Sequence, residues 1–249
     1  MDLTTGAASA YLNGGQKPDG SWIWFPQNQI AAGECGGIKN CYVEFGDING
    51  DGKADYLVGD YTTGQTSAWL SGGAATGGGW IWDPQGTAQI NFALVAGTVL
   101  QWVDLNNDGF ADMVMTSPDG ITSALQNLGP GAGGWTAYTR LGALGVISNG
   151  PTLANGYINR FGDINNDGRA DLLSVLTDGS IALELNQGTL PNLFNGGGSI
   201  IASGVGAPGS QIQFADINGD GRVDYLIVPP TGQVTAWLNN GGNNYNAAY

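Results

Sequence analysis

The chain has 249 residues, which is enough to bury a substantial core as one large all-β domain or two small ones. Its 21 acidic and 7 basic residues give a formal net charge of −14, which argues against nucleic acid or an anionic membrane surface as a partner. The 44 glycines favour turns over helices, and the absence of histidine removes the usual general base and the usual zinc ligand. No apolar run is long enough to cross a bilayer, so we expect no membrane insertion.

The first segment contains two strand-like stretches with no acidic loop before them. It runs from Tyr11-Leu12-Asn13-Gly14-Gly15 to Trp22-Ile23-Trp24. Alternating residues bounded by Gly and Asn are typical of half-buried antiparallel strands. The same order of stretches closes the units that follow, so we predict a half repeat at residues 1–30.

A nine-residue acidic pattern, DxNxDGxxD, then recurs four times. The copies begin at Asp47, Asp104, Asp163 and Asp216, at intervals of 57 (47 to 104), 59 (104 to 163) and 53 (163 to 216) residues. An aromatic residue precedes every copy by two positions, and a second strand-like stretch, a Gly turn and two further stretches follow it. We predict four repeats, at about residues 41–87, 99–140, 156–200 and 210–249.

Four short antiparallel strands per repeat are typical of one propeller blade, and a period of this size is typical of an array of blades. The predicted fold is therefore an all-β propeller of about five four-stranded antiparallel blades, four full repeats plus one half repeat, in a single domain of residues 1–249. Ring closure stays open between three arrangements. These are five blades with one incomplete, a ring completed by a second chain, and a fragment of a longer protein.

The acidic pattern supplies the ligands that calcium prefers. Calcium takes about six to eight oxygens, which loops of this kind provide from side chains at positions 1, 3 and 5 and from the carbonyl at position 7. Position 6 is Gly in every copy, where the chain must turn sharply around the ion. The alternative is a polar turn without metal, which four copies of one ligand set make less favourable than a single copy would. We expect about four Ca²⁺ ions, which would change the formal charge from −14 to −6 (−14 + 8).

The phrases Phe45-Gly46-Asp47-Ile48-Asn49-Gly50-Asp51-Gly52 and Phe214-Ala215-Asp216-Ile217-Asn218-Gly219-Asp220-Gly221 resemble FG-GAP/VCBS repeats. These repeats are the calcium-binding blades of integrin-α-type β-propellers and of several fungal lectins. In that family the loop joins the first two strands of a blade and the ion fastens them, which implies ligands at positions 1, 3, 5, 7 and 9. The implied metal ligands are Asp47, Asn49, Asp51, Lys53, Asp55, Asp104, Asn106, Asp108, Phe110, Asp112, Asp163, Asn165, Asp167, Arg169, Asp171, Asp216, Asn218, Asp220, Arg222 and Asp224.

The two cysteines, Cys35 and Cys41, lie six positions apart in a Gly-rich loop. We favour a disulfide between them over two free thiols, because calcium loops of this kind need extracellular calcium concentrations and disulfides persist in the same compartment. The expected location is therefore secreted and extracellular.

Recognition of a ligand is the function that these features favour. Aromatic residues such as Trp22, Trp80 and Trp135 recur at matching positions and would stack on a sugar, although packing between blades is the simpler explanation for most of them. Exposed connections that vary on a rigid scaffold commonly carry recognition. The connections that differ most are residues 30–41, 88–99, 141–155 and 201–210. We expect a lectin-like module for a glycan, or an adhesion module for an extracellular protein.

Two other functions stay open. The first is a non-catalytic accessory module of a larger secreted hydrolase. The second is a self-assembling structural protein that exchanges strands between chains, a homo-oligomer formed through the unmatched half repeat. We expect no enzyme, because the chain has no GxSxG motif and its acidic residues outside the loops share no motif suited to glycoside hydrolysis. A calcium-dependent polysaccharide lyase with a Lys or Arg base is the enzymatic alternative.

Overall fold

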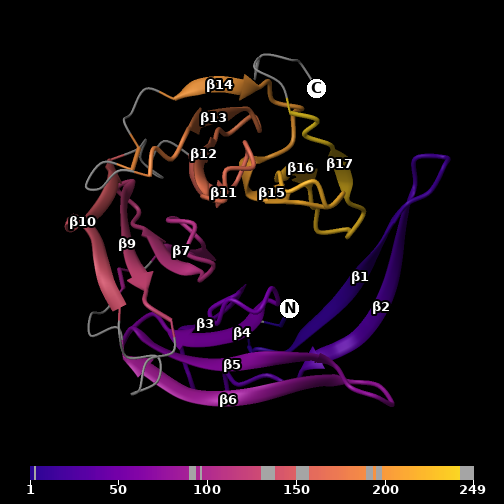
Figure 1. Cartoon of the computed structure of the whole chain (residues 1–249), viewed down its shortest axis with the longest axis vertical. Helices are drawn as coiled ribbons and strands as arrows, with labels where there is room; N and C mark the ends of the chain where they lie inside the picture. The colour runs from indigo at the N-terminus through magenta and orange to yellow at the C-terminus, as the bar shows by residue number, and fades with distance from the viewer. Residues whose placement is uncertain are drawn as a thin grey trace. The chain divides into compact units, whose positions relative to one another are not determined.

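The computed structural model describes residues 1–2, 4–89, 94–95, 97–129, 138–149, 157–188, 193–194 and 198–241. Within these residues the chain is all-β, apart from a short 3₁₀ turn at Gly209–Gln211. Strands that follow one another in the sequence are neighbours in the sheets, as Figure 1 shows. No helix in the described part of the chain is long and apolar enough to cross a membrane.

Main-chain proximity divides the chain into two compact units. Unit 1 comprises residues 1–96, 109–111 and 126–139, and unit 2 comprises residues 97–108, 112–125 and 140–249.

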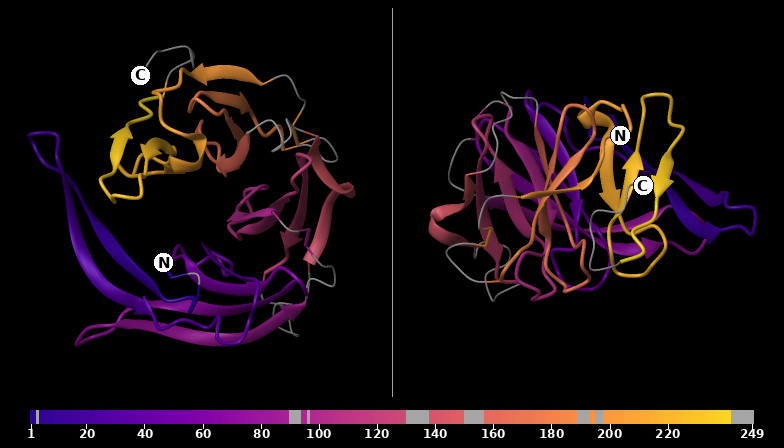
Figure 2. Two further views of the ribbon diagram at one scale, coloured as in Figure 1. Left: turned by 180° about the vertical axis from the view of Figure 1, so that it is seen from behind. Right: turned by 90° about the horizontal axis from the view of Figure 1, so that it is seen from above.

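Unit 1 holds a two-stranded and a four-stranded sheet. The two-stranded sheet is a hairpin of β1 (Ala8–Gln16) and β2 (Trp22–Ala31). The four-stranded sheet has the order β3 (Cys41–Gly46), β4 (Asp55–Asp60), β5 (Gln65–Ala74) and β6 (Trp80–Gln89). Figure 2 shows the β1–β2 hairpin diverging from β5 and β6 toward its tip.

A buried apolar cluster joins the base of the hairpin to the four-stranded sheet. Ala8 and Ala31 from the hairpin pack with Val43, Tyr56 and Val58 from β3 and β4. Burial of these side chains is the main force that holds the hairpin base in place.

The predicted disulfide is confirmed, because Cys35 and Cys41 are bonded to each other. Cys35 is buried in the same cluster, so the disulfide fastens the connection between β2 and β3 to the core of unit 1.

Unit 2 holds most of a second four-stranded sheet, a third four-stranded sheet and a three-stranded sheet. The last two residues of β9 and the first two of β10 are grouped with unit 1. The strands in sheet order are β10 (Tyr138–Asn149), β9 (Ile121–Asn127), β8 (Asp112–Thr116) and β7 (Val99–Val103); then β11 (Ile158–Gly162), β12 (Asp171–Val175), β13 (Ile181–Glu184) and β14 (Ser199–Ala202); then β15 (Ile212–Ala215), β16 (Asp224–Ile227) and β17 (Thr235–Trp237).

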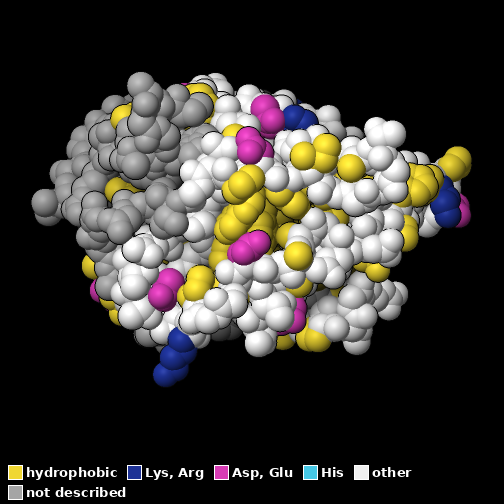
Figure 3. Space-filling view, turned by 90° about the horizontal axis from the view of Figure 1, so that it is seen from below, with side chains coloured by type: hydrophobic (Ala, Val, Ile, Leu, Met, Phe, Trp, Pro, Cys, Tyr) yellow, Lys and Arg dark blue, Asp and Glu magenta, His cyan; other side chains and the backbone are white. Residues whose placement is uncertain are grey.

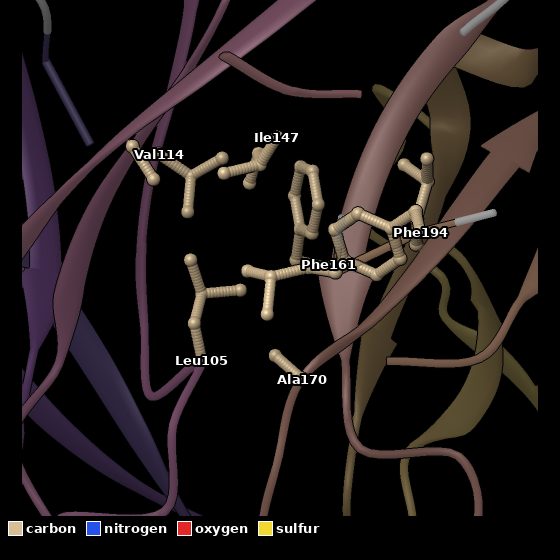
Figure 4. Packing of buried hydrophobic residues seen from close by; sticks show 9 residues of the cluster. Leu105, Val114, Ile147, Phe161, Ala170 and Phe194 are labelled. Atoms are coloured by element: carbon tan, nitrogen blue, oxygen red, sulfur yellow. The ribbon is translucent and has the colours of Figure 1, made fainter. Parts of the chain in front are cut away.

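Apolar side chains fill the space between neighbouring sheets of unit 2. The second strands β8 and β12 are buried along their whole length, because neighbouring strands cover their edges and packed layers cover their faces. One buried cluster, shown in Figure 4, contains Leu105, Val114, Ile147, Phe161, Ala170 and Phe194. A second cluster contains Leu173, Val175, Ile181 and Ile212, and it joins the third four-stranded sheet to the three-stranded one.

The predicted blade organisation is confirmed at the level of the sheets. The described part of the chain has three four-stranded sheets, one three-stranded sheet and the hairpin that corresponds to the predicted half repeat. The predicted count of about five blades and the single domain of residues 1–249 stay predictions. Trp135 and the end of the last predicted repeat, residues 242–249, lie outside the described residues.

One predicted connection is wrong in part. Residues 141–155 were expected to link two repeats, but β10 extends from Tyr138 to Asn149. The segment differs between the repeats, which favoured a connection, whereas main-chain pairing with β9 makes residues 141–149 part of a strand.

Candidate metal-binding loops and a surface depression

Each predicted loop connects the first and second strands of a sheet, as the resemblance implied. The last residue of the first strand pairs with position 9 of the loop, which begins the second strand. The four pairs are Gly46–Asp55, Val103–Asp112, Gly162–Asp171 and Ala215–Asp224. An aspartate therefore stands where every loop closes.

The aspartate at position 1 organises the turn. Asp47 accepts hydrogen bonds from the main-chain N–H groups at positions 4, 5 and 6 of its loop, at 2.7, 3.1 and 2.7 Å. Asp163 and Asp216 accept bonds from the same three positions. The glycine at position 6 has a positive φ in each loop, a conformation that residues with a Cβ rarely adopt. These glycines are Gly52, Gly109, Gly168 and Gly221.

The aspartate at position 5 forms an ion pair with the base at position 7 in three of the loops. The nitrogen–oxygen distances are 2.8 Å for Lys53–Asp51, 2.8 Å for Arg169–Asp167 and 3.5 Å for Arg222–Asp220. The Lys53 ammonium donates to Asp51 and thereby lowers the pKa of that carboxyl. These pairs lie near the surface, where an ion pair contributes little to stability.

The second loop differs at this point, because position 7 is Phe110. The side chain of Asn106, at position 3, donates from Nδ2 to Asp108 Oδ2 at 2.9 Å. The carboxylate of Asp108 therefore has no base from position 7 of its own loop beside it.

The aspartates at position 9 are completely buried, with 0% of their surface exposed. Asp171 shows their role: its Oδ2 accepts the N–H of Ile164 at 3.0 Å, and its Oδ1 accepts the N–H of Asn186 at 2.7 Å. One carboxylate thus connects the start of the loop to the end of the third strand. Asp55 and Asp224 make the corresponding two bonds.

Burial of these carboxylates disfavours their charge. Desolvation raises the pKa of Asp171 to about 6, although its two main-chain hydrogen bonds oppose the shift. Desolvation also raises the pKa of Asp55 and of Asp224, and the other aspartates of each loop add to the effect. A cation beside each buried carboxylate would offset this cost.

The loops fit calcium in donor chemistry and in charge. Every donor at positions 1, 3, 5, 7 and 9 is an oxygen, the ligand type that this hard cation requires, and a buried carboxylate stands at position 9. Among the described residues, no group of three acidic side chains converges closely enough to hold a metal ion. In the first, third and fourth loops the base at position 7 engages the position-5 carboxylate, so calcium would compete with that base for the carboxylate.

An asparagine that follows the third strand, outside the DxNxDGxxD motif, connects neighbouring repeats. In unit 2, Asn186 Nδ2 donates to the carbonyl of Leu105 in the preceding loop at 2.8 Å and to Ala170 of its own loop at 3.0 Å. Asn239 makes the same pair of bonds to Ile164 (2.8 Å) and Val223 (3.3 Å). In unit 1, Asn127 bonds to Ile48 and Ala111 in the corresponding way.

Main-chain bonds follow the same route between loops. The N–H at position 8 of a loop donates to the carbonyl at position 1 of the preceding loop, at 2.7 to 2.8 Å. The three bonds run from Ala111 to Asp47, from Ala170 to Asp104 and from Val223 to Asp163. The second, third and fourth loops are therefore each bonded to the loop before them in the sequence.

The asparagine at position 4 adds a third connection in unit 2. Asn107 Nδ2 donates to the carbonyl of Asp167 at 3.3 Å, and Asn166 Nδ2 donates to Asp220 at 3.2 Å. A Cβ on Gly168 would overlap Asn107, so the glycine at position 6 also makes room for the neighbouring loop.

An open depression lies on one face of the sheet β11–β14. Its volume is about 300 Å³. Ser174, Ala182 and Ile200 are paired across β12, β13 and β14, so their side chains form a row on this face. The lining residues are Tyr157, Ser174, Leu176, Ala182, Glu184, Gly198 and Ile200. The depression thus combines an aromatic ring and a carboxylate over a buried hydroxyl, and no sequence motif marks it.

Comparison with known proteins identifies the repeats. The model of the FG-GAP-like repeat matches residues 104–174 and 163–227, and no curated protein matches the chain. Among solved structures, an Agrocybe aegerita lectin that recognises non-reducing terminal N-acetylglucosamine matches with a TM-score of 0.45 and 16% identity, over 96% of this chain and 74% of the lectin chain. The Photorhabdus luminescens Tc holotoxin pore matches with a TM-score of 0.49 and 19% identity, over 95% of this chain and 11% of that chain.

The matched residues 104–227 contain the second, third and fourth loops in full. The chain is therefore a protein with FG-GAP-like repeats, as its loop phrases indicated.

Proposed function

We propose that this chain is an exported, non-catalytic recognition module whose repeats bind calcium and whose ligand is a carbohydrate. The depression on β11–β14 is the observation that carries the proposal for the ligand. Its volume of about 300 Å³ is at the lower end of the usual range for small-molecule sites, roughly 300 to 1,000 Å³.

The chemistry of the depression suits a sugar ring. The Tyr157 ring offers a flat apolar surface for the C–H face of the sugar. Glu184 lies on the same face of the sheet as Ser174 and would accept hydrogen bonds from sugar hydroxyl groups, whereas the buried Ser174 hydroxyl already donates to Asn159 Oδ1 at 3.0 Å. A neutral glycan also avoids the repulsion that an anionic ligand would meet from a chain with a formal charge of −14.

The depression favours binding over hydrolysis. Among its lining residues Glu184 is the only acidic one, whereas glycoside hydrolysis generally requires two carboxylates on opposite sides of the bond. The depression has one carboxylate, and the chain has no histidine that could act as a general base. The residues on this face therefore support recognition of a glycan over its hydrolysis.

Calcium would support the site from the loops. Residues at positions 1, 3, 5, 7 and 9 would hold each ion and neutralise the buried position-9 carboxylate. At about 1 mM Ca²⁺, a site with a Kd of order 10⁻⁴ M contributes roughly 1.4 kcal/mol to the free energy of unfolding. Export supplies both the calcium and the oxidising conditions that keep Cys35 and Cys41 bonded.

A glycan array with the calcium-loaded chain tests the proposal, followed by calorimetry on the best binder. We expect Tyr157→Ala and Glu184→Gln to weaken that binding by about tenfold or more, as for the loss of one good contact. Asp83→Asn, an exposed carboxylate on β6, is the matched control and should leave the affinity unchanged. An array without binders, or an affinity that survives both substitutions, contradicts the proposal.

A further inference from the structure

The β1–β2 hairpin reproduces the β5–β6 hairpin with a constant offset of 58 residues. In β1–β2, Tyr11 pairs with Pro26 and Asn13 with Trp24. The same register pairs Trp69 with Pro84 and Ser71 with Trp82 in β5–β6. The two hairpins are therefore the same structural element, once alone and once within a full sheet.

The turn before each hairpin is the same as well. Thr4 N–H donates to Asp2 Oδ1 at 2.8 Å, and Thr62 N–H donates to Asp60 Oδ1 at 2.7 Å. The equivalence includes this turn and the strand pairing as far as Ser9–Gln29, which corresponds to Ser67–Thr87.

Within the full sheet, the aromatic residues of β5–β6 pack beside aromatic residues of the neighbouring strands β3 and β4. The ring of Trp69 lies 5.3 Å from Tyr56, and the ring of Trp82 lies 5.6 Å from Tyr56 and 6.5 Å from Phe45. The equivalent residues of the lone hairpin, Tyr11 and Trp24, are 64% and 42% exposed. The lone hairpin thus lacks the aromatic neighbours that β3 and β4 supply to β5–β6.

The edge of β1 is open in the same way. In the four-stranded sheet β5 pairs with both β4 and β6, whereas in the described part of the chain β1 pairs only with β2. Neither β1 nor β2 contains an Asp, Glu, Lys or Arg. Long exposed edge strands normally carry charges that prevent pairing with another chain, and this one has none.

Exposed apolar side chains accompany the open edge. Leu12 and Phe25 are exposed and are paired with each other across the hairpin. The charged residues of the hairpin, Lys17 and Asp19, both lie in the turn at its tip. Figure 3 shows hydrophobic side chains at the surface along this end of unit 1, with charged side chains at the extremity.

We propose that this hairpin is a self-association surface, on which the β1 strand of a second copy pairs with β1 to form the four-stranded antiparallel sheet β2–β1–β1–β2. The occupant must offer an open strand edge and aromatic side chains for Tyr11 and Trp24, and the hairpin of a second copy offers both. Identical surfaces that meet across a twofold axis form a closed dimer. The formal charge of −14 makes two copies repel each other, and the uncharged hairpin strands are where this repulsion is weakest.

Light scattering coupled to size-exclusion chromatography tests the proposal on the whole chain, at loading concentrations from about 1 to 100 μM, a range that spans the affinities of specific dimers of modest strength. We expect a mass that rises to twice 25.6 kDa with concentration. Tyr11→Lys should keep the chain monomeric, because it places a charge on the edge strand. Trp24→Ser is the second variant and should weaken association without adding a charge.

Ile81→Lys is the matched control, because Ile81 is an exposed apolar residue in the β5–β6 hairpin, whose strand β5 already pairs with β4. It should leave the dimer intact. A wild-type chain that stays monomeric at about 100 μM overturns the proposal, and so does a dimer that resists both hairpin substitutions.

A peptide of residues 40–61 with Cys41→Ser, added to a monomeric chain, would reveal the other occupant, the first strand pair of a repeat from a different polypeptide. Its binding would shift the fluorescence of Trp24.

Discussion

The side-chain amide of Asn186 donates to the carbonyl of Leu105, 81 positions earlier in the sequence, at 2.8 Å. The same amide donates to Ala170 at 3.0 Å, and the main-chain N–H of Asn186 donates to the buried carboxylate of Asp171. One residue just after the third strand, β13, therefore connects to its own loop and to the loop of the preceding repeat.

We predict that Asn186→Ala lowers the free energy of unfolding by about 2 to 4 kcal/mol. The side chain is 2% exposed, and its loss leaves two buried carbonyls without this donor. Urea unfolding followed by tryptophan fluorescence measures the change. Asn240→Ala, an exposed asparagine in the next repeat, is the control and should cost less than about 0.5 kcal/mol. Equal costs for the two substitutions would contradict the role assigned to Asn186.

We predict that Asp171→Asn costs more stability in calcium than in chelator. Without metal, the substitution removes a buried charge whose pKa burial raises to about 6, and this relief offsets part of the lost hydrogen bonding. With calcium, the substitution also removes a ligand of the ion. We expect a difference of about 1 to 2 kcal/mol between the two conditions, comparable to the contribution of one site. Identical costs in EDTA and in 1 mM CaCl₂ would show that Asp171 does not bind the ion.

We predict that Lys53→Gln strengthens calcium binding at the first loop by about two- to fivefold. The ammonium of Lys53 occupies the carboxylate of Asp51 at 2.8 Å and competes with the ion for it, with the modest strength of an exposed ion pair. The gain should decrease at high salt, because screening weakens the same pair. Calorimetric titration measures the affinity. Lys39→Gln removes the same charge from an exposed position outside the loops, and a gain of equal size there would identify a general charge effect instead.

We predict that reduction of the disulfide destabilises the chain by about 2 kcal/mol, the amount expected for a loop of this length. Cys35 and Cys41 are six positions apart, and Cys35 is buried against the base of the hairpin. The double substitution Cys35→Ala and Cys41→Ala should reproduce the effect of the reductant. A melting temperature that is insensitive to both would show that the buried cluster alone holds this connection.

The sequence specified the parts of the fold that depend on residues close together in the chain. The strands on either side of each loop and the positive φ of Gly52 and its three equivalents follow from local spacing and turn chemistry. The disulfide, which joins cysteines six positions apart, was expected from the oxidising compartment that calcium loops of this kind indicate. The position of Asp171 at the first residue of the second strand was likewise implied by the resemblance.

The connections between repeats could not be predicted from the loop motif. Asn127, Asn186 and Asn239 each stand 15 positions after the last aspartate of their loop, a regular signal that alignment of the third strands would have revealed. Their partners, however, are carbonyls of another repeat, and any residue type presents a carbonyl. The depression on β11–β14 is also invisible in the sequence, because its residues come from four separate segments without a shared motif.

The calcium content of the purified chain tests the account most directly. After treatment with EDTA and dialysis into about 1 mM CaCl₂, in the range where extracellular modules are occupied, elemental analysis should find four calcium ions per chain. Their removal should lower the free energy of unfolding by roughly 5 to 6 kcal/mol, the sum of four sites. A calcium-free chain at this concentration, with the same unfolding curve in EDTA, would contradict the central claim that the four loops hold these ions.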